Sequence, residues 1–292
     1  MRRKDRLVTD TNEIKDIIRR GQTCWVAIVD NAIPRMTSLN YSVNFLDGDI
    51  LELYFQYNPN DEKLDIFKQS NEVCFEISYD EGMYVDTDFP RKSTLYYSSV
   101  IGNGRVVSTK EPIKSTATIP ISAVSQLCVD VAKIIVSQNK TCHIAMSDNG
   151  LPYIVPLSYG SNFTNDNTLE LYFHSATEGK KIDVFKKNNN VCFEINNASG
   201  TFVRGNGKVV FLEGDEKHEA LAIMFRHQTG KDIVVDDAMT KGICVYKIVS
   251  TDFIAKTEQW PQANLEQNEN NRDCKIISTN YTAKKNSAVK SA

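Results

Sequence analysis

The chain has 292 residues, of which 41% are hydrophobic and 24% are charged, and its formal net charge is −3. That length has room for about two domains, and this composition can bury real hydrophobic cores. The small net charge gives no broad basic field for nucleic acid or acidic membranes. No apolar segment of signal-peptide type follows the basic start MRRKDR, and no apolar run reaches transmembrane length. We therefore expect a cytoplasmic protein with neither a nucleic-acid nor a membrane partner.

The first part of the chain has the pattern of short strands separated by turns. Asp10 and Glu13 are spaced as a helix cap before apolar residues at helical spacing, which predicts a helix over residues 11–20. Gly102 and Gly104 predict a bulge or a close backbone contact inside a strand. Residues 79–94 are polar and are expected to be irregular. The predicted strands are 24–29, 34–45, 50–56, 73–78 and 95–107, with a helix at 63–68.

Residues 108–122 are rich in Pro, Ser and Thr and are expected to contain a domain boundary. The second part of the chain then repeats the strand pattern, and Gly230 is placed to end a late helix. Residues 263–292 are rich in Asn, Lys and Ser, and they are expected to form a disordered tail. The predicted helices are 123–137 and 215–227, and the predicted strands are 142–147, 152–163, 168–174, 191–196 and 243–249.

The chain contains an internal repeat. Residues 23–77 align with residues 141–195 at a constant offset of 118, with 25 identities in 55 positions and no gap. We interpret this as a tandem duplication, with domains at 1–118 and 119–262 and a tail at 263–292. The first copy has no counterpart of the final helix and strand. Cysteines recur at equivalent strand positions, which predicts core thiols rather than disulfides or metal ligands.

The stretch that follows the strand ending at His174 has the pattern of an anion site. The loop SATEGKK leads into IDVFKK, so Gly179, Lys180 and Lys181 lie at or near the start of a helix, and Ser175 adds a hydroxyl. Backbone N–H groups and the dipole at a helix start favour a phosphate, and the two lysines add full charges. The alternative is a solvated helix start, because surface lysine pairs are common. His174 either lines a pocket, transfers protons or is a simple strand-end histidine.

The first copy differs at these positions. Gln56, Tyr57, Asp61 and Glu62 replace His174, Ser175, Gly179 and Lys180, and only Lys63 matches a lysine of the second copy, Lys181. Asp and Glu at a helix start repel a phosphate. We therefore expect the second copy to hold one phosphate group and the first to hold none.

The stretch YFHSATEGKKIDVFKKNNNVCFE resembles the flavin-binding split barrels related to pyridoxamine 5′-phosphate oxidase, and the nitroimidazole-resistance (Nim-like) branch in particular. MRRKDR, PYIVPLSYG and SVIGNGRV are similar to the same branch. The resemblance implies a mainly β fold, with flanking helices, of two tandem FMN-binding split barrels packed as an intrachain pseudo-dimer. A single chain would then be a monomer with flavin in a groove between the barrels.

The resemblance also implies a set of cofactor-binding residues. The strand along the flavin would be Tyr153, Ile154, Val155, Pro156 and Leu157; the cradle would be His174, Ser175, Lys180 and Lys181; the opposite barrel would add Tyr97 and Ser99. The implied function is an FMN-dependent oxidoreductase acting on a small molecule, with NAD(P)H as a candidate donor, a nitroaromatic acceptor possible and His174 the candidate catalytic residue. The alternative is a non-enzymatic flavin- or haem-binding protein. No metal site is expected.

Overall fold

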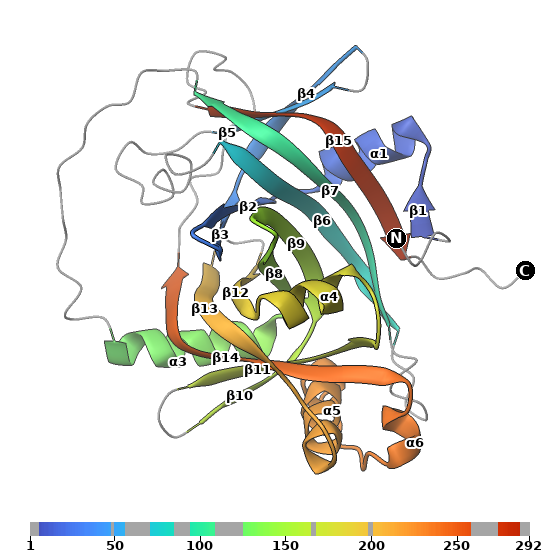
Figure 1. Ribbon diagram of the computed structural model, residues 1–292, viewed down its shortest axis with the longest axis vertical. Coiled ribbons are helices and arrows are strands. Elements are labelled where there is room, and N and C mark those ends of the chain that lie inside the picture. Colours follow the sequence, from blue (N-terminus) through green and yellow to red (C-terminus); the bar gives the residue numbers. More distant parts are fainter. Residues whose placement is uncertain are drawn as a thin grey trace, which may run out of the picture.

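The protein is mainly β and forms two antiparallel sheets with few helices, in two split-barrel halves (Figure 1). The structure, a computed structural model, describes residues 6–47, 50–55, 71–84, 94–108, 125–164, 168–197, 201–257 and 274–286. The helix expected at 63–68 and the boundary expected at 108–122 lie outside the described residues, apart from Ser108. None of the helices among the described residues is long and apolar enough to cross a membrane.

The first sheet has the strand order β3-β2-β6-β7-β15-β5-β4, and β1 pairs with the far end of β15. Among the described residues, helix α1 (Thr11–Arg20) covers it, and Asp10 caps this helix by accepting a hydrogen bond of 2.9 Å from the Glu13 backbone N–H. The strands are β1 (Leu7–Val8), β2 (Cys24–Asp30), β3 (Ile33–Leu39), β4 (Tyr41–Leu46), β5 (Ile50–Phe55), β6 (Glu72–Tyr84), β7 (Thr94–Ser108) and β15 (Cys274–Asn286).

The second sheet has the strand order β10-β11-β14-β13-β12-β8-β9. Its strands are β8 (Thr141–Asp148), β9 (Leu151–Ser158), β10 (Gly160–Phe163), β11 (Leu169–Ala176), β12 (Asn190–Asn196), β13 (Thr201–Phe211) and β14 (Ile243–Thr257). Its helices are α3 (Ser125–Gln138), α4 (Lys180–Lys187), α5 (Asp215–Thr229) and α6 (Asp237–Thr240). Helix α5 packs on β10, β11 and β14, at the bottom of the view in Figure 1.

The two sheets have the same strand order when β4, β5, β15, β7, β6, β2 and β3 are set against β10, β11, β14, β13, β12, β8 and β9. Individual side-chain contacts recur as well. Lys247 Nζ lies 2.6 Å from Glu170 Oε1 in the second sheet, and Lys275 Nζ lies 2.6 Å from Glu52 Oε1 in the first. The strand β15 therefore occupies in the first sheet the place that β14 occupies in the second.

The prediction of a disordered tail is wrong for residues 274–286. This segment is β15, which pairs with β5 and β7 along its length and buries Ile276 and Ala283 completely. The prediction that the first copy lacks the final strand is wrong for the same reason. A second, short repeat in the sequence indicates this strand, because KIVSTDFIAK (247–256) matches KIISTNYTAK (275–284) at six of ten positions. The second sheet is thus inserted in the chain between two adjacent strands of the first.

Some expected elements have different limits. The strands expected at 34–45 and 152–163 are each divided in two, at Asn40 and Tyr159. At the second break the Tyr159 hydroxyl is buried and donates to the Val136 carbonyl over 2.7 Å. Residues 79–84, expected to be irregular, continue β6. The prediction of a close contact at Gly102 is confirmed, because a Cβ there would lie 2.5 Å from the Phe75 ring.

The two halves pack against each other through a shared apolar cluster. Trp25, Ala27, Met36 and Cys74 come from the first half, and Ala145, Ile154 and Cys192 from the second. The cysteines at equivalent strand positions, Cys24, Cys74, Cys142 and Cys192, are buried free thiols, as predicted.

Two fully buried carboxylates accompany this cluster. Glu194 of β12 accepts from its ladder neighbour Arg204 over 2.7 Å. Glu76 of β6 has Ile101 as its ladder neighbour on β7, and its ion pair is instead with His143 of the second half, at 2.9 Å. A buried charge needs a partner of opposite sign. The first half therefore depends on a contact with a residue of the second half, His143.

We predict that Ile276→Ala destabilises the protein by about 2–5 kcal/mol, because it opens a cavity beside a fully buried strand residue. The exposed Thr282 on the same strand provides the control, and Thr282→Ala should change stability by no more than about 0.5 kcal/mol. Denaturant unfolding measures both. Equal, negligible effects would mean that residues 274–286 do not belong to the folded sheet.

Candidate functional site

Helix α4 begins with an open N-terminus. Gly179 occupies the N-cap position with a φ of 131°, and no side chain caps the helix. Residues with a Cβ rarely adopt this conformation, which explains glycine at this position. The first backbone N–H groups of the helix are therefore available to an acceptor from outside the helix.

Lys180 is an exposed cation at the start of α4. Its Nζ lies 3.2 Å from Asp148 Oδ2 and 4.5 Å from the centre of the Tyr153 ring. Its side chain is 58% exposed, so this ion pair is screened by water and is weak. A ligand at this position would have to compete with the Asp148 carboxylate for the lysine.

Lys181 is a partly buried cation, and none of the described carboxylates forms an ion pair with it. Burial is the main cause that lowers its pKa to about 8, and the nearby charge of Lys284 lowers it further. The Lys181 Nζ lies 5.8 Å from the centre of the Tyr246 ring. Two lysines close enough to disfavour each other's charge create a site where an anion is stabilised.

His174 lies on β11, two residues before its end, and its Nδ1 atom is shielded from solvent without a hydrogen-bond partner among the described residues. Burial, assisted by the charge of Lys181, lowers the His174 pKa to about 4. The imidazole is therefore neutral at neutral pH. Ser175, the next residue, donates its hydroxyl to the Ala176 carbonyl over 3.0 Å.

Residues of the first half lie opposite the lysines and His174 of the second half. Ser99 of β7 is 1% exposed, and its Oγ has no hydrogen-bond partner among the described residues. Its ladder neighbour on β15 is Lys284, whose pKa burial lowers. Tyr97, two residues before Ser99, lies close enough to Tyr153 to contribute, after burial and Cys74, to raising the Tyr153 pKa to about 12.

The strand β9 runs along the edge of the second sheet, where it pairs with β8 and packs against β6 and β2. The side chains of Ile154 and Val155 are buried in apolar clusters. Tyr153, Pro156 and Leu157 are only partly buried. Of the five strand residues predicted to contact a cofactor, Ile154 and Val155 could do so only through their backbone.

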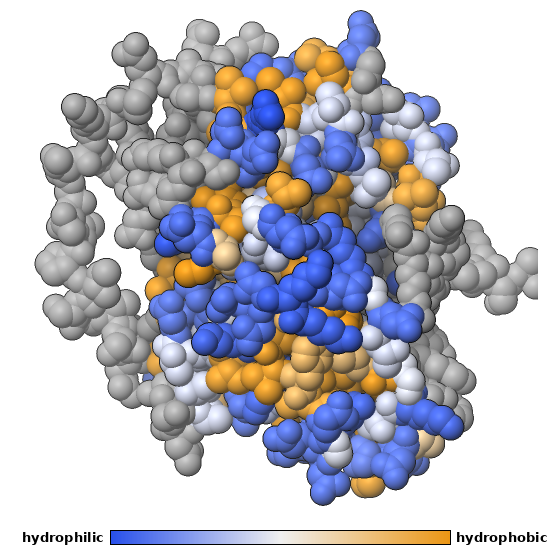
Figure 2. Space-filling model, viewed as in Figure 1, coloured by the Kyte–Doolittle hydropathy of each residue, from blue (hydrophilic) through white to orange (hydrophobic). Residues whose placement is uncertain are grey.

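The structure thus brings most of the predicted site residues to one junction between the halves. The second half contributes Tyr153, His174, Lys180 and Lys181, and the first half contributes Tyr97 and Ser99. Figure 2 shows a hydrophilic band over α4, with hydrophobic side chains between this band and α5. The equivalent positions of the first half, from Gln56 to Lys63, lie outside the described residues.

Sequence reasoning missed Lys284, because it lies in the segment expected to be a tail. It is the last residue of the KIISTNYTAK repeat, and this repeat was the available signal. Its position beside Ser99 and close to Lys181 makes it a member of the candidate site. The site therefore combines residues of β7, of β9, of β11 with α4, and of β15.

The chain is similar to several known proteins. Residues 130–256 match a family model described as pyridoxamine 5′-phosphate oxidase. A structure of a candidate 5-nitroimidazole antibiotic resistance protein from Bacteroides thetaiotaomicron is 21% identical, covering 70% of this chain and 94% of that one, with a TM-score of 0.39. A candidate pyridoxamine 5′-phosphate oxidase from Listeria innocua is 19% identical, covering 44% and 98%, with a TM-score of 0.35. An FAD-binding protein from Mesorhizobium loti is 17% identical, covering 50% and 90%, with a TM-score of 0.31. No curated protein sequence matches the chain.

We predict that the His174 imidazole titrates near pH 4 in the protein without a ligand, because burial and Lys181 both disfavour its charge. Lys181→Met removes the positive neighbour and should raise this pKa. NMR of the imidazole signals, assigned with His174→Gln, measures both values while circular dichroism checks that the chain stays folded. A midpoint near 6.5 in the unmodified protein would show that the ring is solvated.

Proposed function

We propose that this chain, whose residues 130–256 form a pyridoxamine 5′-phosphate oxidase-like domain, binds FMN at the junction of its two halves and acts as an FMN-dependent oxidoreductase. The observation that carries the proposal is Lys181, a partly buried lysine that none of the described carboxylates neutralises and that lies near a second lysine, Lys284. A phosphate group is the kind of ligand that would stabilise both charges.

The residues present fit this cofactor. Lys181, Lys284 and the open N-terminus of α4 would hold the phosphate group. Ser99 Oγ and His174 Nδ1 are shielded polar atoms without partners among the described residues, and a bound heterocycle with donors and acceptors would satisfy them. The aromatic side chains of Tyr153 and Tyr97, one from each half, would flank the site.

When bound, a flavin would supply the redox chemistry between a donor such as NAD(P)H and an acceptor. The chain contributes binding, orientation and electrostatics. Because the His174 pKa is about 4, its imidazole stays neutral and serves as a hydrogen-bonding group rather than as an acid that loses a proton near neutral pH. The acceptor is a small molecule, for which a nitroaromatic compound is the first to test.

The second candidate function is haem binding, and the neutral imidazole of His174 favours it because Nδ1 has no partner among the described residues. An absorbance spectrum of the purified protein separates the two candidates. Flavin absorbs in the near-ultraviolet and the blue, and haem gives a Soret band. Steady-state oxidation of NAD(P)H then separates an enzyme from a flavin-binding protein without activity.

We predict that the purified protein is a yellow monomer with one FMN per chain, and that Lys180→Glu weakens FMN binding at least about tenfold. The substitution places a negative charge where the phosphate would lie. Lys187→Glu, the same change at the other end of α4, should leave the affinity nearly unchanged. Fluorescence quenching on titration of the flavin-free protein measures the affinity, and light scattering with flavin quantification measures the stoichiometry.

The two lysine variants decide between a phosphate site and a general charge effect. Equal losses in Lys180→Glu and Lys187→Glu would show that only the overall charge matters. A colourless protein that also fails to bind added FMN would refute the proposed function.

We predict that FMN affinity is constant between about pH 7 and pH 8 and then falls as the pH rises. Lys181 has a pKa of about 8 without ligand, so above that pH binding must also take up a proton, and the affinity falls by up to about tenfold per pH unit. Lys181→Arg keeps its charge and should reduce this slope, although Lys284 leaves part of it. An equal slope in both proteins would exclude Lys181 as a phosphate ligand.

A further inference from the structure

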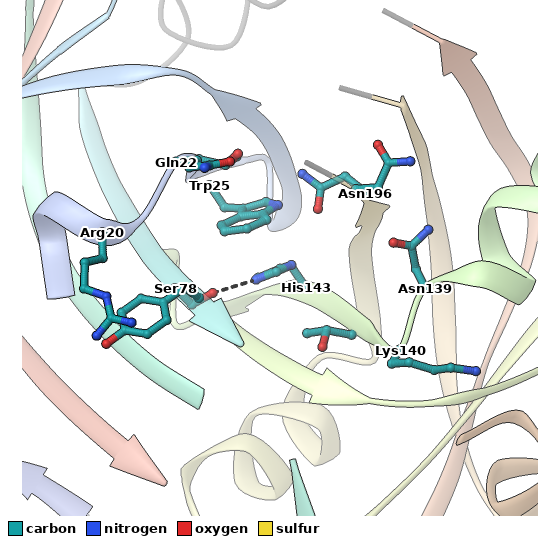
Figure 3. A pocket seen from close by; sticks show the side chains of 12 residues that line it. Arg20, Gln22, Trp25, Ser78, Asn139, Lys140, His143 and Asn196 are labelled. Atoms are coloured by element: carbon teal, nitrogen blue, oxygen red, sulfur yellow. Dashed lines mark hydrogen bonds between the residues drawn. The ribbon is translucent and has the colours of Figure 1, made fainter. Parts of the chain in front are cut away.

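A cavity lies between the two halves, apart from the proposed flavin site. Its volume is about 290 Å³, which is suited to a small metabolite. Figure 3 shows the rings of Trp25 and His143 stacked on one side, with Asn139 and Asn196 across from them. None of the residues assigned above to the flavin site lines this cavity.

The cavity is lined by equivalent residues of the two halves. At the sequence offset of 118, Thr23 corresponds to Thr141, Trp25 to His143 and Ser78 to Asn196, and all six residues line the cavity. The cavity therefore lies where each half contacts the other through its equivalent surface. The two sides differ at Trp25 and His143, and at Gln22 and Lys140.

Two buried ring nitrogens at the cavity are without partners. Trp25 is 6% exposed and His143 is 3% exposed, and neither Trp25 Nε1 nor His143 Nδ1 has a hydrogen-bond partner among the described residues. The rings are 3.5 Å apart between centroids and inclined by 15°, so each holds the other in place. Buried donors without partners are rare in folded proteins, and a bound ligand is one way to satisfy them.

The other ring nitrogen of His143 faces the protein. Nε2 lies 2.9 Å from Oε2 of Glu76, a carboxylate that is fully buried, and 3.4 Å from the Ser78 hydroxyl oxygen. The ladder neighbour of Glu76 is Ile101, where the second half has Arg204. Nδ1 is thus the nitrogen of His143 left for a ligand, and a proton on it makes it a donor, like the indole N–H of Trp25.

We propose that this cavity binds a small oxyanion, a carboxylate or a phosphate, which accepts hydrogen bonds from Trp25 Nε1 and His143 Nδ1. The residues that line the cavity carry positive charge and no negative charge. Among the described ones, Arg20 and Lys140 are cations and none is a carboxylate, although Arg20 pairs with Asp16 and Lys140 donates to the His227 carbonyl. Both halves are needed to form this site, and it does not depend on whether flavin binds elsewhere.

The experiment titrates the full-length protein, as purified, with citrate in one series and inorganic phosphate in another, by calorimetry in a Tris chloride buffer. We expect one saturable site for at least one probe, and the tighter probe identifies the class of anion. Trp25→Phe keeps a ring on His143 but removes the donor, and it should weaken binding about tenfold. Trp260→Phe, the same change at the only other tryptophan, is the control and should not weaken it.

A direct reading of the hydrogen bond comes from NMR. In the Trp260→Phe protein, the single indole N–H signal belongs to Trp25, and it should move downfield in step with the calorimetric saturation. The Lys180→Glu variant should bind the probe as well as the unmodified protein does. Absence of saturable binding for both probes, equal affinity in Trp25→Phe, or a loss in Lys180→Glu would each overturn the proposal.

Discussion

The docking of the two halves depends on two carboxylates that are fully buried where the sheets face each other. Glu194 is paired with Arg204, which also donates to Thr37 of the first half over 3.2 Å, and Glu76 lies 2.9 Å from His143 Nε2 across the junction. Removing one partner of such a pair costs about 3–5 kcal/mol, because the remaining charge has no water around it. An apolar cluster alone would tolerate sliding of one sheet over the other. These directional contacts select one arrangement, and both the proposed flavin site and the cavity exist only in that arrangement.

The halves share a strand order but differ in charge where they meet. The second half contributes His143 and Arg204 to the buried pairs and Lys181 to the candidate site, whereas the first half has Trp25 and Ile101 at the positions of the first two. In a symmetric dimer of identical subunits, equivalent positions on the two sides of the interface would carry the same residue. When both halves lie in one chain, each of these positions can carry a different residue. The protein therefore has different sites on two halves that share one strand order.

Much of the fold could be predicted from local patterns. The helix at 11–20, the duplicated strands and the lysines at the start of α4 follow from capping residues, periodicity and a gap-free repeat, all of which act over short distances in the chain. The strand β15 could not be recognised by the same means. Its residues are mostly polar, because one face of the strand lies toward solvent, and its hydrogen-bond partners β5 and β7 lie more than 160 residues away. Lys284 was missed with it, and the pairing of Glu76 with His143 was missed because no local pattern joins these residues.

The position of β15 also sets the order in which the protein can fold during synthesis. Strands β5 and β4 join the rest of the first sheet through β15, which is the last described segment to leave the ribosome. The second sheet is complete in sequence by Thr257, so it can close while the first still has an open edge at β7. At synthesis rates of about 5–20 residues per second, the interval between β7 and β15 lasts roughly 10–35 s. During that time β7 presents unpaired backbone groups, the condition under which nascent chains pair with one another. Because the second sheet is inserted between β7 and β15, the half of the protein that is synthesised first is the last to complete its sheet and to lose an edge prone to aggregation.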